Sequence, residues 1–133
     1  MKSKDKVIHK VKEDFAFIKD RCFAVLIFGS YARNEEKDYS DIDVCIVLKE
    51  RELNSGILYE DIYQNVRMDI YDVVIFEGCG NDLKYEISKD YIIVYCNNPE
   101  ELRKYLSPPP GYIPIKKTRK ELLNELGVVL NAA

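Results

Sequence analysis

The chain has 133 residues, a net charge of −3 and 32% charged side chains. This length allows one hydrophobic core but not an additional substrate-binding domain, and the acidic balance argues against broad nucleic-acid binding. No secretory signal precedes the chain, and no apolar stretch approaches the roughly 20 residues of a membrane-spanning helix, so we expect a cytoplasmic protein with no membrane contact.

An amphipathic first helix is predicted behind the polar start at Ser3. Its apolar side chains recur at helical spacing and are expected to pack on a sheet; they are Val7, Val11, Phe15 and Ile18. His9, the one histidine, lies off this stripe and is expected to be a surface side chain.

The unbroken apolar run at 22–28 predicts a strand buried on both faces. Gly29 then allows a sharp turn, and residues 31–33 read as the first turn of a short helix. The free amide groups at a helix start, together with the Ser30 hydroxyl, would bind a phosphate. Arg33 has two open interpretations, because its guanidinium could bind a phosphate oxygen or pair with Glu35 or Glu36.

A polar loop follows, in which Glu35, Glu36 and Asp38 are read as solvating side chains. The next strand, predicted at 41–48, begins with two aspartates at i and i+2, Asp41 and Asp43. Side chains alternate along a strand, so these carboxylates share one face. Two negative charges at that spacing repel each other, which predicts a bound cation between them. Carboxylate oxygens are suitable ligands for magnesium, and magnesium also binds the phosphates of a substrate.

The segment VRMDIYDVVIFE offers a third carboxylate, from Asp69 or Asp72. Their odd spacing means that only one of the two can face the metal site from a regular strand. The other would be a solvated charge at the edge of the strand.

Helices and strands alternate along the rest of the first hundred residues. The predicted elements are an interrupted helix over 53–62, a strand at 66–76, a helix at 82–89 opened by Asn81 or Asp82, a strand at 91–95, and a helix capped by Asn98 with Pro99 in its first turn.

Four cysteines, Cys22, Cys45, Cys79 and Cys96, show no Cys-x-x-Cys spacing. Three of them lie in or beside apolar runs. We therefore expect reduced thiols rather than disulfides or zinc ligands.

The apolar strand, Gly29-Ser30, the spacer and Asp41-x-Asp43 together resemble the polymerase-β-like nucleotidyltransferases, and most closely the minimal nucleotidyltransferases. The resemblance covers roughly residues 22 to 95. It implies an α/β (α+β) fold with a mixed sheet of about four strands flanked by helices. It also favours Asp72 as the third carboxylate, because apolar residues follow it at once. Asn34 stands where close relatives often carry glycine.

The resemblance implies a function as well. Gly29, Ser30 and Arg33 would bind a nucleoside triphosphate, with ATP as the expected substrate, and the three aspartates Asp41, Asp43 and Asp72 would be catalytic and hold two magnesium ions. A nucleoside monophosphate, expected to be AMP, would pass to an acceptor. Minimal nucleotidyltransferases commonly occur beside a helical partner of the HEPN type, some as antitoxins that adenylylate it. The alternatives are a catalytically silent, nucleotide-responsive subunit of such a partner and a template-free enzyme that extends RNA ends.

The nucleotidyltransferase domain is predicted to span 1–106, and 107–133 to form a Pro-rich linker with a helical extension. The segment SPPPG at 107–111 reads as a semi-rigid spacer. Thr118 and Glu121 predict a capping box for a last helix. Its ridge of Leu122, Leu123 and Leu126 would either fold back on the domain or dock a partner or a second copy of the chain.

Overall fold

The computed structural model describes residues 4–36, 41–49 and 55–113. Its centre is a mixed sheet with the strand order β3-β2-β1-β4. The strands are β1 (Cys22–Phe28), β2 (Ile42–Leu48), β3 (Tyr71–Ile75) and β4 (Tyr91–Cys96). β1 runs antiparallel to both β2 and β4, whereas β2 and β3 are parallel. The predicted fold class, a mixed four-stranded sheet flanked by helices, is confirmed.

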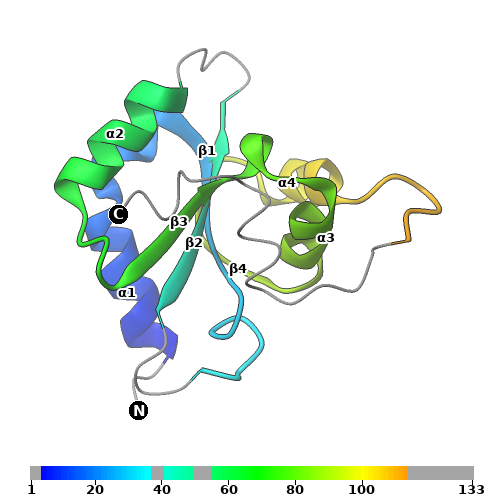
Figure 1. Ribbon diagram of the computed structural model, residues 1–133, viewed down its shortest axis with the longest axis horizontal. Coiled ribbons are helices and arrows are strands. Elements are labelled where there is room, and N and C mark those ends of the chain that lie inside the picture. The colour runs from blue at the N-terminus through cyan, green and yellow to red at the C-terminus, as the bar shows by residue number, and fades with distance from the viewer. Residues whose placement is uncertain (1–3, 37–40, 50–54, 114–133) are drawn as a thin grey trace.

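Helices cover both faces of this sheet (Figure 1). α1 (Lys4–Asp14) and α2 (Ser55–Asn65) lie on one face, and α3 (Asn81–Lys89) and α4 (Pro99–Leu106) lie on the other. Two short 3₁₀ helices complete the fold, η1 (Ala16–Arg21) before β1 and η2 (Phe76–Gly78) after β3.

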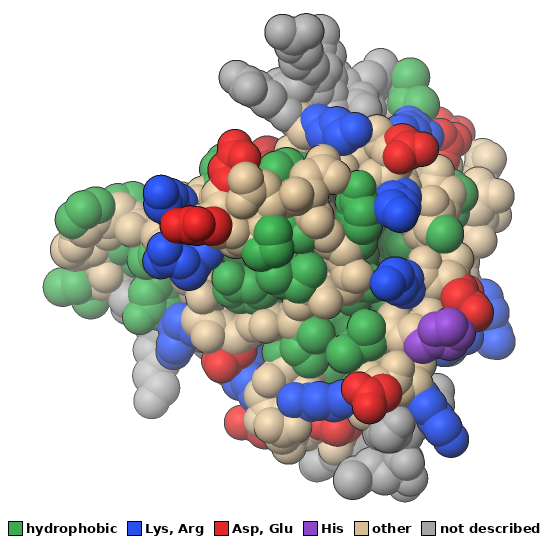
Figure 2. All heavy atoms as spheres, turned by 180° about the vertical axis from the view of Figure 1, so that it is seen from behind, with side chains coloured by type: hydrophobic (Ala, Val, Ile, Leu, Met, Phe, Trp, Pro, Cys, Tyr) green, Lys and Arg blue, Asp and Glu red, His purple; other side chains and the backbone are tan. Residues whose placement is uncertain are grey.

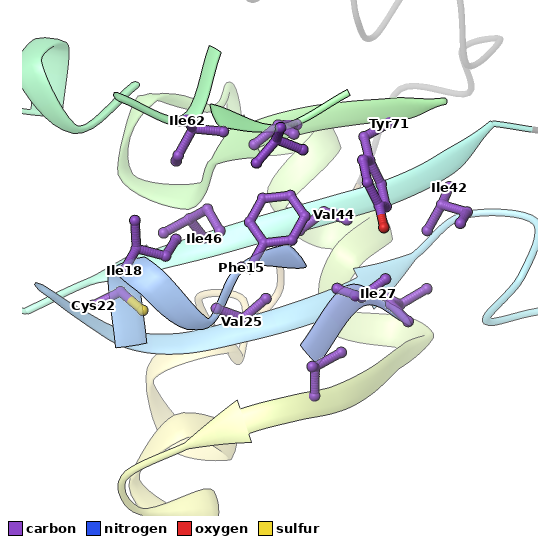
Figure 3. Packing of buried hydrophobic residues seen from close by; sticks show 14 of the residues in the cluster. Phe15, Ile18, Cys22, Val25, Ile27, Ile42, Val44, Ile46, Ile62 and Tyr71 are labelled. Atoms are coloured by element: carbon purple, nitrogen blue, oxygen red, sulfur yellow. The ribbon is translucent and has the colours of Figure 1, made fainter. Parts of the chain in front are cut away.

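The hydrophobic core has one layer on each side of the sheet. In the first, Phe15, Ile18 and Ile62 meet Val44 and Tyr71 from the strands (Figure 3). The second joins the other strand face to α3 and α4, and includes Leu26, Cys45, Val74, Leu83 and Leu102. The predicted alternation along β2 is confirmed, because Val44 and Cys45 belong to opposite layers.

The predicted first helix divides into two elements. α1 ends at Asp14, and Ile18 belongs to η1. Side chains three residues apart align in a 3₁₀ helix, so Phe15 and Ile18 both reach the core as expected.

The strand predicted at 66–76 is wrong at both ends. It begins only at Tyr71, because residues 67–70 form a turn in which the Ile70 amide donates to the Arg67 carbonyl at 3.1 Å. The Arg67 guanidinium and the Asp69 carboxylate pair across this turn at 2.7 Å. After Ile75 the chain enters η2 instead of continuing as a strand.

The predicted helix at 53–62 is one continuous helix, Ser55–Asn65, and residues 53 and 54 lie outside the described ranges. α3 begins at Asn81, and the capping position is Gly80, not Asn81 or Asp82. The start of α4 is as predicted: the Asn98 side chain accepts a hydrogen bond of 3.1 Å from the Glu101 amide, and Pro99 begins the helix.

The chain turns back onto α3 after α4. The Tyr112 hydroxyl donates to the Asp82 carboxylate, and its ring lies 5.7 Å from the Tyr85 ring between centroids. Residues 107–113 are therefore held against the domain. The predicted capping box and leucine ridge fall within residues 114–133, which lie outside the described ranges. The division of the chain at residue 106 stays a prediction.

Charged side chains of both signs are interspersed on the face shown in Figure 2. His9 is at the surface and contacts Glu13 at 2.9 Å, as expected for a side chain off the apolar stripe. All four cysteines are free thiols, and Cys22, Cys45 and Cys79 are buried. Among the described helices, none is both long and apolar enough to cross a bilayer.

Candidate active site

A tight turn follows β1 at the end of the sheet where the candidate site lies. Gly29 has a φ of 73°, a left-handed conformation that favours glycine. The next residues make a single helical turn, in which the Arg33 amide donates to the Gly29 carbonyl at 3.1 Å. The predicted short helix is therefore reduced to one turn.

Asn34 ends this turn. Its φ is 60°, the Glu35 amide donates to the Ser30 carbonyl at 2.8 Å, and the Asn34 amide donates to Tyr31 at 3.5 Å. These paired bonds are those of a Schellman motif, whose left-handed position is usually glycine and sometimes asparagine. The bonds that close the turn are donated by the amides of residues 33–35.

Arg33 makes the local pair that was one of its two predicted roles. Its Nε donates to Glu35 Oε2 at 3.1 Å, and Glu35 is exposed. Such surface pairs contribute little to stability. The guanidinium can therefore exchange this partner for a phosphate at small energetic cost.

Two of the candidate carboxylates lie level on neighbouring strands. Asp43 is in register with Phe28 of β1 on one side and with Asp72 of β3 on the other. Residues in register point to the same face, and Asp43 and Cys45 alternate with Val44, so Asp43 and Asp72 face the α3 and α4 side. Asp41 precedes β2 by one residue. The structure thus brings Asp72 beside Asp43, whereas Asp69 lies in the preceding turn and pairs with Arg67.

The three carboxylates differ in exposure. Asp43 is buried, with 1% of its surface exposed, whereas Asp72 is half-buried and Asp41 is exposed. Burial raises the pKa of Asp72 above its ordinary value, and the negative charge of Asp41 raises it further. Asp41 and Asp72 are therefore close enough to repel each other, which is the electrostatic setting that a cation would relieve.

The donor chemistry of this group fits magnesium, because all three side chains supply carboxylate oxygens. Within residues 4–36, 41–49 and 55–113, however, no three acidic, histidine or cysteine side chains are gathered tightly enough to hold a metal ion as they stand. Magnesium is usually held by one or two carboxylates, several waters and the phosphates of the substrate. The arrangement therefore suits an ion that arrives with a nucleotide better than one held in a complete protein cage.

Two further polar side chains have environments that the sequence did not indicate. Glu36 was assigned to loop solvation, but one of its carboxylate oxygens is enclosed and has no hydrogen-bond partner among the described residues. Burial raises the pKa of Tyr59 on α2, and Tyr63 and Asp72 raise it further. The only sequence signal for Tyr59 was its spacing of four residues from Tyr63 on one helix.

Known proteins share both the sequence pattern and the fold. A family described as polymerase beta, nucleotidyltransferase, matches residues 10–100. A protein of Methanocaldococcus jannaschii, provisionally named a protein adenylyltransferase, is 35% identical over 75 residues. That match covers 56% of this chain, and the chain spans only 57% of the length of that relative.

Two solved structures have a similar fold. A toxin-antitoxin structure with AMP-PNP superposes with a TM-score of 0.57 at 15% identity, covering 74% of this chain and 82% of the other. A complex of a tri-AMPylated HEPN toxin with its MNT antitoxin, from Shewanella oneidensis, gives a TM-score of 0.50 at 11% identity, covering 78% and 83%. At these identities the superpositions show a shared fold alone. Because the family match spans most of the chain and the expected sheet is present, the chain belongs to the polymerase-β nucleotidyltransferase family.

Proposed function

We propose that the protein is a magnesium-dependent nucleotidyltransferase that moves AMP from ATP to a hydroxyl acceptor on a protein. The observation that carries this proposal is the position of three features at one end of the sheet. The Gly29-Ser30 turn follows the last residue of β1, and that residue, Phe28, lies in register with Asp43, which lies in register with Asp72. The turn and a carboxylate pair thus lie side by side, which supports a site for a phosphate group and a metal ion.

The turn would bind the triphosphate. Its leading amides and the Ser30 hydroxyl donate to phosphate oxygens, and the left-handed Gly29 leaves room for them because it has no side chain. Arg33 would leave Glu35 and bind a further phosphate oxygen through two of its donors. These groups hold the α-phosphorus in a fixed orientation toward the acceptor.

Asp41, Asp43 and Asp72 would hold magnesium together with the phosphates. When bound, the ions supply charge neutralisation on the triphosphate and lower the pKa of the attacking hydroxyl. Asp72 is the candidate to accept the proton of the acceptor, because it is half-buried and lies on an edge strand where an acceptor can approach.

The acceptor and the partner are proposed from the relatives. The Methanocaldococcus jannaschii relative is named for protein adenylylation, and the Shewanella oneidensis complex contains an AMPylated HEPN toxin. We propose a helical partner of the HEPN type as the protein acceptor.

The experiment is transfer of label from each of the four α-labelled ribonucleoside triphosphates to a purified HEPN-type protein, with and without magnesium. We expect label from ATP, dependent on magnesium, and none with Asp43→Asn. The matched control is Asp69→Asn, which removes an exposed carboxylate from the turn before β3. Binding of ATP without transfer to any acceptor would instead support the catalytically silent subunit.

A further inference from the structure

Four residues, one from each strand, form a row across the end of the sheet that holds the candidate site. Asp43 is in register with Asp72 on one side and with Phe28 on the other. Phe28 is in turn in register with Tyr91, the first residue of β4. The aspartates therefore form one end of the row, on β3 and β2, and Tyr91 forms the other end, on the opposite edge strand.

Tyr91 points to the same face of the sheet as the two aspartates. Its ring packs against the core layer that lies under α3 and α4. Asp43 and Asp72 also face this layer, because the residue after each of them belongs to the opposite layer. One phenol and two carboxylates are thus presented on one face and at one end of the sheet.

The Tyr91 side chain is anchored by packing and keeps its polar end available. The residue is half-buried, so the ring is held against the core while part of the side chain meets solvent. Among the residues that the structure describes, none forms a hydrogen bond with the Tyr91 hydroxyl. This hydroxyl can therefore donate to a ligand without first breaking a bond within the protein.

The spacing along the row fits a chain of phosphates. Neighbouring strands lie about 4.8 Å apart, so the Cα atoms of Tyr91 and Asp43 are separated by about 10 Å. The turn at Gly29 follows Phe28 and begins between them. A triphosphate with its α-phosphate beside the aspartates and its next phosphate at this turn would extend toward β4, where the phenol of Tyr91 lies.

We infer that Tyr91 is a phosphate-binding residue, which donates its hydroxyl to the terminal phosphates of the nucleotide. This inference rests on the proposed function, in which those phosphates leave as pyrophosphate. The α-phosphate is bound at the other end of the row, beyond the reach of the phenol. Tyr91 therefore makes the site selective for ligands that carry the terminal phosphates, such as ATP and pyrophosphate, over AMP.

The test is calorimetry of the full chain and of Tyr91→Phe with three separate ligands, ATP, pyrophosphate and AMP, each with magnesium. The substitution removes one oxygen and keeps the ring, so the melting temperature should not change. A hydrogen bond to a charged phosphate predicts that the affinity for ATP and pyrophosphate falls roughly 10- to 150-fold. The affinity for AMP should be the same in both proteins.

Tyr95→Phe is the matched control, because Tyr95 lies on the same strand and its hydroxyl donates to Asn97 at 2.6 Å, away from the row. It should leave the affinity for all three ligands unchanged. ATP affinity that is equal in the wild type and in Tyr91→Phe would overturn the inference and leave the proposed function intact. An equal loss for AMP would also overturn it, because the contact would then lie at the nucleoside or the α-phosphate. A wild-type chain that binds neither ATP nor pyrophosphate would overturn the proposed function, and the inference with it.

Discussion

Removal of the Ser30 hydroxyl tests the phosphate-binding turn most directly. The turn is held by main-chain bonds, including the one from the Glu35 amide to the Ser30 carbonyl at 2.8 Å, and Ser30→Ala leaves these bonds unchanged. The melting temperature should therefore stay close to that of the wild type. A hydrogen bond to a charged phosphate contributes about 1.5–3 kcal/mol, so ATP affinity should fall roughly 10- to 150-fold.

Isothermal titration calorimetry with ATP and magnesium measures this loss, and thermal unfolding of the same samples checks the fold. Ser107→Ala is the matched control, because the Ser107 hydroxyl donates to the Arg103 carbonyl at 2.8 Å in α4 and is remote from the turn. It should leave ATP affinity unchanged. A steep drop in melting temperature for Ser30→Ala, with unchanged affinity, would show that Ser30 has a structural role and would refute the phosphate assignment.

Three further predictions concern the carboxylates and one helix cap. The double variant Asp41→Asn with Asp43→Asn should lose magnesium-dependent ATP binding in calorimetry, and equal affinity in both proteins would contradict the metal assignment. Asp72→Asn should abolish transfer of labelled AMP with the fold retained, whereas Asp69→Asn should keep most of the activity; the reverse result would exchange their roles. Asn98→Ala removes the acceptor for the Glu101 amide and should lower the free energy of unfolding by about 1 kcal/mol, which urea denaturation measures; no change would show that water replaces the cap.

The elements predicted best are those whose pattern depends only on neighbouring residues. The uninterrupted apolar run at 22–28 became β1 with the same bounds. The cap of α4 was also readable, because Asn98, Pro99 and Glu101 interact within one turn. Asn34, which stands where close relatives often carry glycine, has a positive φ that few residues tolerate.

The strand around Asp72 shows where local patterns fail. Apolar alternation predicted a strand from residue 66. In the structure, residues 67–70 form a turn with an Arg67–Asp69 ion pair, so the strand begins only at Tyr71. The choice between the two aspartates rested on resemblance and on alternation. The parallel register of β2 and β3 then placed Asp72 level with Asp43. The register between two strands depends on contacts between residues that are distant in sequence, so a local pattern does not predict it.

The sequence by itself determined the chemistry available to this protein: a glycine that permits the turn after β1, a hydroxyl beside it, and carboxylates on one face of a strand. Each of these depends on backbone preferences and side-chain period within a few residues. Only the tertiary structure decided how they combine. Strand pairing set Asp72 beside Asp43, and packing left Asp43 buried while Asp41 stayed exposed. These outcomes come from contacts between segments remote in the chain, which no local pattern contains.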